Sequence, residues 1–242
     1  MYTKDQFLKL IDTHIKEYGY HITIVTSCPN PRYAYSIGLS DLVNFEIIFA
    51  GGIIYSKDEV EIIFDAVVDK LKTEKNINDL KIYVENLGFF SLSNVDDSWC
   101  KLMMLGVFDY YKVDKVKAYQ IIPDSIHYTL DIPDMSKGRT DSTEPIWQWL
   151  NQEWGYSVPV NSTVITNINT LFGEEITELT RWENDEWEMF AGPGPDVKKE
   201  DVRVVPLATI LGIDKSILPA LKLDIGEGLW RDSRESEWNN WE

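Results

Sequence analysis

An irregular polar stretch at residues 134–145 constrains the fold most, because it separates two segments of different composition. The stretch reads Asp-Met-Ser-Lys-Gly-Arg-Thr-Asp-Ser-Thr-Glu-Pro and follows neither a helical nor a strand periodicity. Small, polar, glycine and proline residues in such a run are typical of loops. Eight of the nine tryptophans follow it, and only Trp99 precedes it. We therefore predict two domains, 1–135 and 146–242, joined by a linker at 136–145.

The first segment shows three amphipathic helical patterns and six strand patterns. Thr3 and Ser56 each begin a capping box, with Gln6 and Glu59 three residues later, and apolar residues then recur at helical spacing. The expected helices are 3–18, 56–71 and 96–110, and the expected strands are 21–26, 33–39, 45–50, 80–85, 89–95 and 116–122. These patterns predict an α+β domain whose antiparallel sheet carries three helices on one side.

The second segment predicts a smaller, mostly β domain with short helices. A helix over 145–154 has Pro145 in its first turn, where proline is tolerated, and stops before Gly155. The expected strands are 163–168, 175–182, 187–190 and 202–206, and short helical turns are expected at 207–211 and 215–221. The fold class predicted for the whole chain is therefore α+β in two domains.

Several motifs stand out in residues 1–135, namely Gly19-Tyr20-His21, Pro31-Arg-Tyr-Ala-Tyr-Ser-Ile-Gly-Leu39, Gly51-Gly52, Gln120 and Pro123-Asp124. Together they resemble a bacterial family known as domain of unknown function 4262. The chain departs from the family at Asn44-Phe45-Glu46, where the family usually has His-Pro-Glu. Any catalytic role of that histidine would be absent here. The family has no established chemistry to carry over.

A second set of motifs lies at roughly residues 160–232, namely Val164-Ile-Thr-Asn167, Ile176, Arg181, Trp187-Glu-Met-Phe-Ala-Gly192, Val204–Ile210, Asp214-Lys-Ser-Ile217 and Leu223-Asp-Ile-Gly226. This set resembles the immunity protein 33 family, also known as domain of unknown function 2185. The resemblance implies a protein that neutralises a toxin used in competition between bacteria.

The charge balance is strongly acidic, with 40 acidic and 23 basic residues and a net charge of −17. The second segment, from Thr140 onward, carries 20 acids and 8 bases, a net −12. Such a surface excludes nonspecific nucleic-acid binding and docking on anionic membranes, and it favours capture of a basic partner. The start of the chain shows no signal-peptide core, and Cys28 and Cys100 form no Cys-x-x-Cys pair. We therefore expect a cytoplasmic protein with two free thiols.

Evidence for an enzyme is sparse in the sequence. If 21–26 and 33–39 pair as a hairpin, His21 comes near Tyr35 and Ser36, and a Ser-His pair could act as nucleophile and base. However, Ser36 lies in a strand and no Gly-x-Ser-x-Gly motif is present. The sequence contains no recognised metal or nucleotide motif, so no metal or cofactor is predicted.

A predicted hairpin tip near residues 182–188 favours binding instead. Tryptophans anchor interfaces because they bury a large area with few rotamers, and acids around them orient a cationic partner. The candidate partner-binding residues are Trp182, Glu183, Asp185, Glu186, Trp187, Glu188, Trp238 and Trp241. Trp182 and Trp187 could instead belong to the core, and Trp238 and Trp241 could fold back on the domain.

Together these observations predict an immunity-type protein that blocks a bacterial toxin by occluding its active surface. That surface would be basic if, for example, the toxin is a nuclease. The alternative hypothesis is an enzyme or a small-ligand-binding protein that uses a first-domain pocket at His21, Tyr35 and Ser36. The sequence leaves the oligomeric state open.

Overall fold

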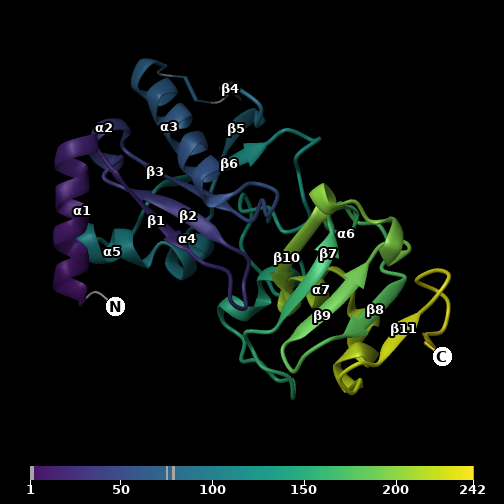
Figure 1. The fold of residues 1–242 in the computed structure, drawn as a ribbon. Coiled ribbons are helices and arrows are strands. Elements are labelled where there is room, and N and C mark those ends of the chain that lie inside the picture. Colours follow the sequence, from purple (N-terminus) through teal and green to yellow (C-terminus); the bar gives the residue numbers. More distant parts are fainter. Residues whose placement is uncertain (1–2, 75, 78–79, 242) are drawn as a thin grey trace. The chain divides into compact units, whose positions relative to one another are not determined.

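Two six-stranded sheets organise the chain, and each forms the centre of a separate compact unit (Figure 1). The computed structural model describes residues 3–74, 76–77 and 80–241. The first unit comprises Met1–Val25, Tyr33–Tyr128 and Asp134–Arg139, and the second comprises Thr26–Arg32, Thr129–Pro133 and Thr140–Glu242. The α+β class predicted from the sequence, with one sheet in each half, is confirmed.

The sheet of the first unit has the strand order β1-β2-β3-β6-β5-β4. Its strands are β1 (His21–Val25), β2 (Tyr33–Ile37), β3 (Glu46–Ala50), β4 (Ile82–Val84), β5 (Gly88–Asn94) and β6 (Ala118–Pro123). Its helices are α1 (Lys4–Tyr18), α2 (Ser40–Val43), α3 (Lys57–Thr73), α4 (Asp97–Met103) and α5 (Leu105–Tyr111). Both predicted capping boxes are present, at Thr3 for α1 and at Ser56 for α3.

Helices cover both faces of this sheet, so the expectation of three helices on one side is wrong. One face is covered by α3 (Figure 1). The apolar side of α3 packs in one core with Ala34, Phe49 and Phe90. On the other face, α5 lies against β2, where the Gly106 N–H donates to the Tyr35 hydroxyl at 3.2 Å. The physical reason is that β3 is buried at all five positions, and a strand that is apolar on both faces needs a layer on each.

Two further details of the first unit differ from the prediction. The sheet includes one parallel pair, β3 with β6, because α3, β4 and β5 intervene between these strands in the chain. The helix predicted at 96–110 is two helices that meet at Met104. The break places Gly106 in the first turn of α5, where its backbone N–H lacks a helical partner and can reach Tyr35.

The sheet of the second unit has the strand order β10-β7-β9-β8-β11-β12. Its strands are β7 (Thr163–Asn167), β8 (Glu178–Arg181), β9 (Glu186–Phe190), β10 (Val202–Pro206), β11 (Gly228–Trp230) and β12 (Asn239–Asn240). Its helices are α6 (Ile168–Leu171) and α7 (Leu207–Ile213), with 3₁₀ turns η1 (Pro145–Leu150), η2 (Gly194–Asp196), η3 (Lys199–Asp201) and η4 (Lys215–Lys222).

The segments α7, η1 and η4 pack together on one face of this sheet, which we call the inner face. Gly212 permits close contact between α7 and η1, because a Cβ atom there would lie 2.6 Å from the Ile146 Cα. The helix predicted at 145–154 is a 3₁₀ turn that ends at Leu150. The β8–β9 hairpin is confirmed, although β7 and β9 form a parallel pair that the sequence analysis did not predict.

Candidate functional site

The opposite face of the second sheet is open, and it carries the candidate site. The side chains of β7, β8 and β9 alternate between buried and half-exposed positions, as expected when only one face of a sheet is covered. We call this uncovered side the outer face. It comprises side chains of β8, β9, β10 and β11, together with one residue that follows β8 and one from the C-terminal segment. They are Glu178, Trp182, Glu186, Glu188, Val204, Trp230 and Trp241.

Large apolar side chains on the outer face are unusually accessible. Val204 is 59% exposed, Trp182 and Trp241 are each 49% exposed, and Trp230 is 36% exposed. Three glutamates lie on the same face, and among its described strand positions there is no lysine or arginine. The face therefore combines aromatic surface with unneutralised negative charge.

Glu188 lies near Trp182 on this face. Partial burial raises the pKa of the Glu188 carboxyl above its usual range, and the neighbouring charge of Glu178 adds to the shift, while the nearby Trp182 indole opposes it. Glu188 therefore loses its charge at a higher pH than an ordinary glutamate does.

The Arg181 side chain stabilises the β8–β9 hairpin from the inner face of the sheet. Its guanidinium donates to the backbone carbonyls of Leu223 at 2.7 Å and Asn184 at 2.9 Å. It also lies 4.8 Å from the centre of the Trp187 ring. Because these contacts hold the guanidinium against the core, its charge is directed away from the glutamates of the outer face.

The structure divides the predicted hairpin-tip residues into three groups. Trp187 is fully buried, and its indole donates to the Ala220 carbonyl of η4 at 3.3 Å, so it belongs to the core. Glu183 and Asp185 are exposed in the turn itself. Trp182, Glu186 and Glu188 lie on the outer face. Strand alternation separates them, because successive residues point to opposite faces.

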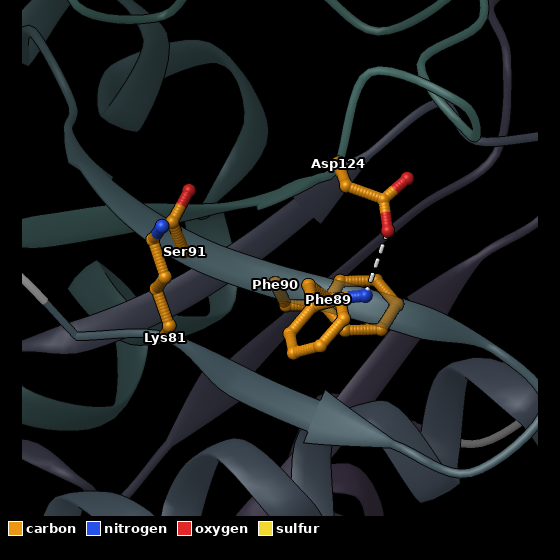
Figure 2. A pocket seen from close by; sticks show the side chains of 5 residues that line it. All are labelled: Lys81, Phe89, Phe90, Ser91 and Asp124. Carbon is orange, nitrogen blue, oxygen red and sulfur yellow. Dashed lines mark hydrogen bonds between the residues drawn. The ribbon is translucent and has the colours of Figure 1, made fainter.

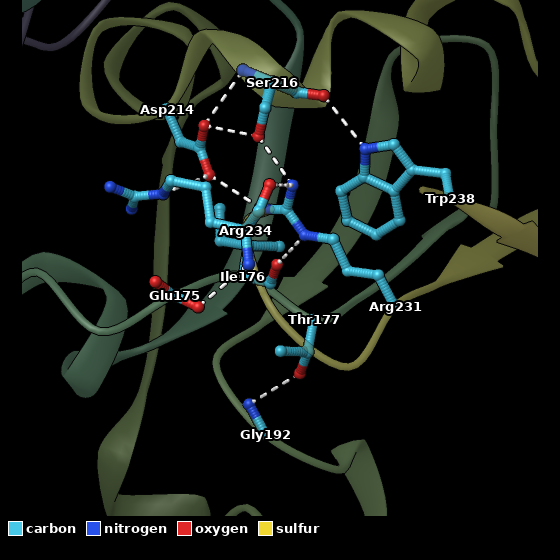
Figure 3. Close-up of polar contacts among 9 residues, drawn as sticks. All are labelled: Glu175, Ile176, Thr177, Gly192, Asp214, Ser216, Arg231, Arg234 and Trp238. Atoms are coloured by element: carbon cyan, nitrogen blue, oxygen red, sulfur yellow. Dashed lines mark hydrogen bonds and ion pairs between the residues drawn. The ribbon is translucent and has the colours of Figure 1, made fainter. Parts of the chain in front are cut away.

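The predicted tail residue Trp238 packs back onto its own domain (Figure 3). Its indole donates to the Ser216 carbonyl at 2.9 Å, and its ring lies 4.1 Å from the Arg231 guanidinium. Arg231, which is 3% exposed, donates in turn to the Asp214 carboxylate at 2.9 Å. Trp238 therefore covers a buried ion pair, a packing role that the polar sequence around it did not indicate.

Asp214 stays ionised despite its burial. Burial alone would raise the pKa of this carboxyl, but two hydrogen bonds from Ser216 and the charges of Arg234 and Arg231 outweigh it and hold the pKa below its usual range. Figure 3 shows these groups converging on the Asp214 carboxylate. The network fixes the C-terminal segment beside β11.

Trp241, in contrast, lies over the sheet on the outer face. Gly228 makes this possible, because a Cβ atom at that position would approach the Trp241 ring to 2.4 Å. The ring centres of Trp241 and Trp230 are 6.4 Å apart. Sequence reasoning missed Trp230 and Val204. The available signal was their alternation with buried neighbours in β11 and β10, since Leu229 and Val205 point inward.

In the first unit, the structure separates His21 from Ser36. The β1–β2 register pairs His21 with Ile37 and Ile22 with Ser36, so the two side chains leave opposite faces of the sheet. The Nδ1 atom of His21 lies 2.9 Å from the Nδ1 atom of His14. Burial, with a smaller contribution from His14, lowers the pKa of His21 to about 4.

Ser36 instead belongs to a buried network around Glu46. The carboxylate of Glu46 accepts hydrogen bonds from the Ser36 hydroxyl at 2.5 Å and from the backbone N–H groups of Gly38 at 3.1 Å and Ser40 at 2.9 Å. Burial raises the pKa of Glu46, and these hydrogen bonds oppose the shift. Tyr35 is also buried, at the contact with Gly106. Tyr35, Ser36 and Glu46 are therefore buried and bonded within the first unit.

A different cavity, of about 330 Å³, lies in the first unit between β5 and the end of β6 (Figure 2). It is lined by Lys81, Phe89, Phe90, Ser91 and Asp124. The Asp124 carboxylate accepts from the Phe89 backbone N–H at 2.8 Å and lies 2.7 Å from the His127 Nδ1. These two contacts hold the Asp124 carboxylate in place. The Phe89 residue is half exposed.

Within the described ranges 3–74, 76–77 and 80–241, no group of three or more His, Cys, Asp or Glu side chains is arranged to hold a metal ion. None of the helices in these ranges has both the length and the apolarity needed to cross a membrane.

Comparison with known proteins identifies part of the first unit. Residues 14–127 match the family model described as domain of unknown function, DUF4262. This match confirms the resemblance predicted for the first half, and it includes the Tyr33–Leu39 motif and Asp124. No curated protein and no solved structure matches the chain. The resemblance of the second half to immunity protein 33 stays a prediction.

Proposed function

We propose that the protein is an immunity-type binding protein, which holds a basic protein toxin on the outer face of the second sheet and so occludes the toxin's active surface. One observation carries the proposal: the outer face is left open, and half-exposed tryptophans alternate there with glutamates that have no basic neighbours among the described strand positions. The resemblance of this half to immunity proteins supports the choice of partner.

The physical chemistry of the face suits tight binding. Trp182, Trp230 and Trp241 present large rigid surfaces whose burial would supply most of the binding energy. The glutamates would steer a positively charged partner and set its orientation. The net charge of −12 after residue 139 would speed the encounter over a longer range. A toxin that acts on nucleic acid needs a basic surface, so it would be both attracted and covered.

Charge reversal on the outer face tests this proposal. The purified chain would be used to capture proteins from its native cell, and the captured proteins would be identified by mass spectrometry. The test variant is Glu186→Lys/Glu188→Lys, which reverses the charge of two half-buried glutamates of β9 on the outer face. We expect the wild-type chain to capture one basic, toxin-like protein, and the variant to lose at least tenfold in capture.

The matched control is Asp114→Lys/Glu153→Lys, which makes the same charge change at two exposed residues outside the outer face. Equal capture by both variants would contradict the proposed location. If the wild-type chain captures no basic protein at low salt, the proposal itself is wrong.

A second candidate function rests on the cavity of Figure 2. Its aromatic wall, together with Lys81 and Asp124, could hold a small ring-bearing ligand with polar substituents. Mass spectrometry of small molecules released from the purified chain tests this candidate. A Ser91→Trp variant would fill the cavity and should release the ligand. Identical small-molecule content in both proteins would exclude this candidate.

A further inference from the structure

A cavity of about 480 Å³ lies at the edge of the outer face, where the C-terminal segment meets β8. Two of its walls are the indole rings of Trp230 and Trp241, which are inclined at 47° to each other. Pro193 forms a third apolar wall. The remaining lining includes the acidic residues Glu178 and Asp232, together with residues of neighbouring loops. Aromatic faces combined with carboxylates are the groups that recognise an organic cation.

Contacts within the sheet hold the walls of this cavity in place. Trp230 pairs across the ladder with Glu178, so the ring and the carboxylate leave the same face side by side. The Gly194 backbone N–H donates to Glu178 Oε2 at 2.8 Å, which fixes that carboxylate. The position of Trp241 depends on the missing side chain at Gly228. The cavity is therefore preorganised, and a ligand would not have to order these groups.

One cation also lines the cavity, but its charge is compensated. Arg231 forms the buried pair with Asp214, and its remaining donors bond to the Ile176 carbonyl at 2.8 Å and the Ser216 hydroxyl at 2.7 Å (Figure 3). Glu178 and Asp232 have no such cationic partner in the contacts of the described chain. The lining is therefore negative overall.

We propose that this cavity receives a basic side chain, an arginine or a lysine, of the protein bound on the outer face. The inference rests on the proposed function and deepens it, since it states which chemical group of the partner is recognised. The cationic head would lie against the inclined indole rings, on their cavity side, and bond to the carboxylates of Glu178 and Asp232. The apolar stem of the same side chain would contact Pro193.

Titration of the whole protein with small cations tests the cavity without the partner. The probes are N-acetyl-arginine amide and N-acetyl-lysine amide, with the uncharged N-acetyl-norleucine amide as the control, at constant ionic strength set with sodium chloride. NMR shifts of the Trp230 and Trp241 indole N–H groups give the readout. We expect saturable shifts with a dissociation constant on the order of 10 mM for the cations. A larger response to arginine would identify guanidinium as the preferred head group, and a larger response to lysine would identify ammonium.

Matched variants locate the response. Glu178→Gln/Asp232→Asn keeps the shape of the cavity and removes its charge, so the response should fall at least tenfold. Glu183→Gln/Asp185→Asn makes the same charge change outside the cavity and should respond like the wild type. A response to norleucine as strong as to lysine, or no response to either cation, would overturn the inference.

The capture experiment separates this inference from the proposed function. Weaker capture by Glu178→Gln/Asp232→Asn would support both. Undiminished capture by that variant would overturn the inference and leave the proposed function intact. Saturable cation binding by a chain that captures no basic protein would overturn the proposed function while the cavity remains a cation site.

Discussion

The two sheets have the same number of strands, but they differ in how their faces are covered. In the first sheet, all five residues of β3 are buried, and helices lie on both faces. In the second sheet, β9 alternates between buried and half-exposed residues, and helical segments cover one face. Polar groups of the first sheet, such as Ser36 and Glu46, form hydrogen bonds with each other and are buried. In the second sheet, Glu186 and Glu188 of β9 are partly exposed to solvent. A binding surface is therefore expected where a sheet has been left uncovered.

The largest expected effect is the difference in stability between tryptophan substitutions on the inner and outer faces of the second sheet. Trp187→Ala removes a fully buried side chain and should lower the free energy of unfolding by about 3–5 kcal/mol. Trp182→Ala removes a half-exposed side chain five residues earlier and should cost less than about 1 kcal/mol. Chemical denaturation followed by circular dichroism gives both values. Similar costs for the two variants would contradict the assignment of an inner and an outer face.

Breaking the buried ion pair should have an effect close to that of Trp187→Ala. Asp214→Ala leaves the Arg231 guanidinium buried without its counter-charge, so we expect a loss of about 3–5 kcal/mol. Asp109→Ala removes the exposed pair with Lys4 and serves as the control, with a much smaller loss because solvent screens this pair. Equal losses in urea unfolding would show that the Figure 3 network does not support the second unit.

A pH-dependent loss of stability should arise in the first unit from His21. The folded protein binds a proton on His21 only near pH 4, while the unfolded chain does so near pH 6.5. Stability from this group is therefore fully present above pH 6.5 and is lost as the pH falls from 6.5 to 4, by about 3 kcal/mol at most. His21→Phe should flatten the profile in this window. An unchanged slope would contradict the burial of a neutral histidine.

The Ser36 hydroxyl should contribute to stability and not to catalysis. Ser36→Ala removes the donor to Glu46 and the acceptor for the Ile47 backbone N–H, so the free energy of unfolding should fall by about 1–3 kcal/mol. Thermal unfolding measures this change. Capture of the partner by the folded variant should be unchanged, since the outer face belongs to the other unit. Reduced capture by a fully folded variant would link the first sheet to binding.

The smallest effect concerns the pH dependence of binding on the outer face. Because the pKa of Glu188 is raised, this carboxylate is protonated earlier than an ordinary glutamate as the pH falls. Binding of the basic partner should therefore weaken severalfold as the pH falls, starting at a higher pH than the titration of an ordinary glutamate would cause, and Glu188→Gln should show a flatter profile. Titration calorimetry at several pH values measures both. A wild-type profile as flat as that of the variant would exclude Glu188 from the contact.

Sequence reasoning was most successful where local chemistry decides the structure. The capping boxes at Thr3 and Ser56 begin helices, the β8–β9 hairpin forms around a polar turn, and the strand at 202–206 has the predicted bounds. These features depend on neighbours a few residues apart. The break at Met104 was missed because the contact that accompanies it, between Gly106 and Tyr35, joins residues that are far apart in the chain.

The candidate site shows the same division. The amino-acid sequence shows that the second half is acidic and rich in tryptophan, and its turn residues predict a hairpin that presents Trp182 and several acids. Which tryptophans are accessible follows instead from the packing of segments that are distant in the chain. Trp187 is covered by η4, Trp238 is held by Arg231, and Trp241 lies over a glycine of β11 beside Trp230. Exposure depends on what packs against a residue from elsewhere in the chain, and no local pattern contains that information.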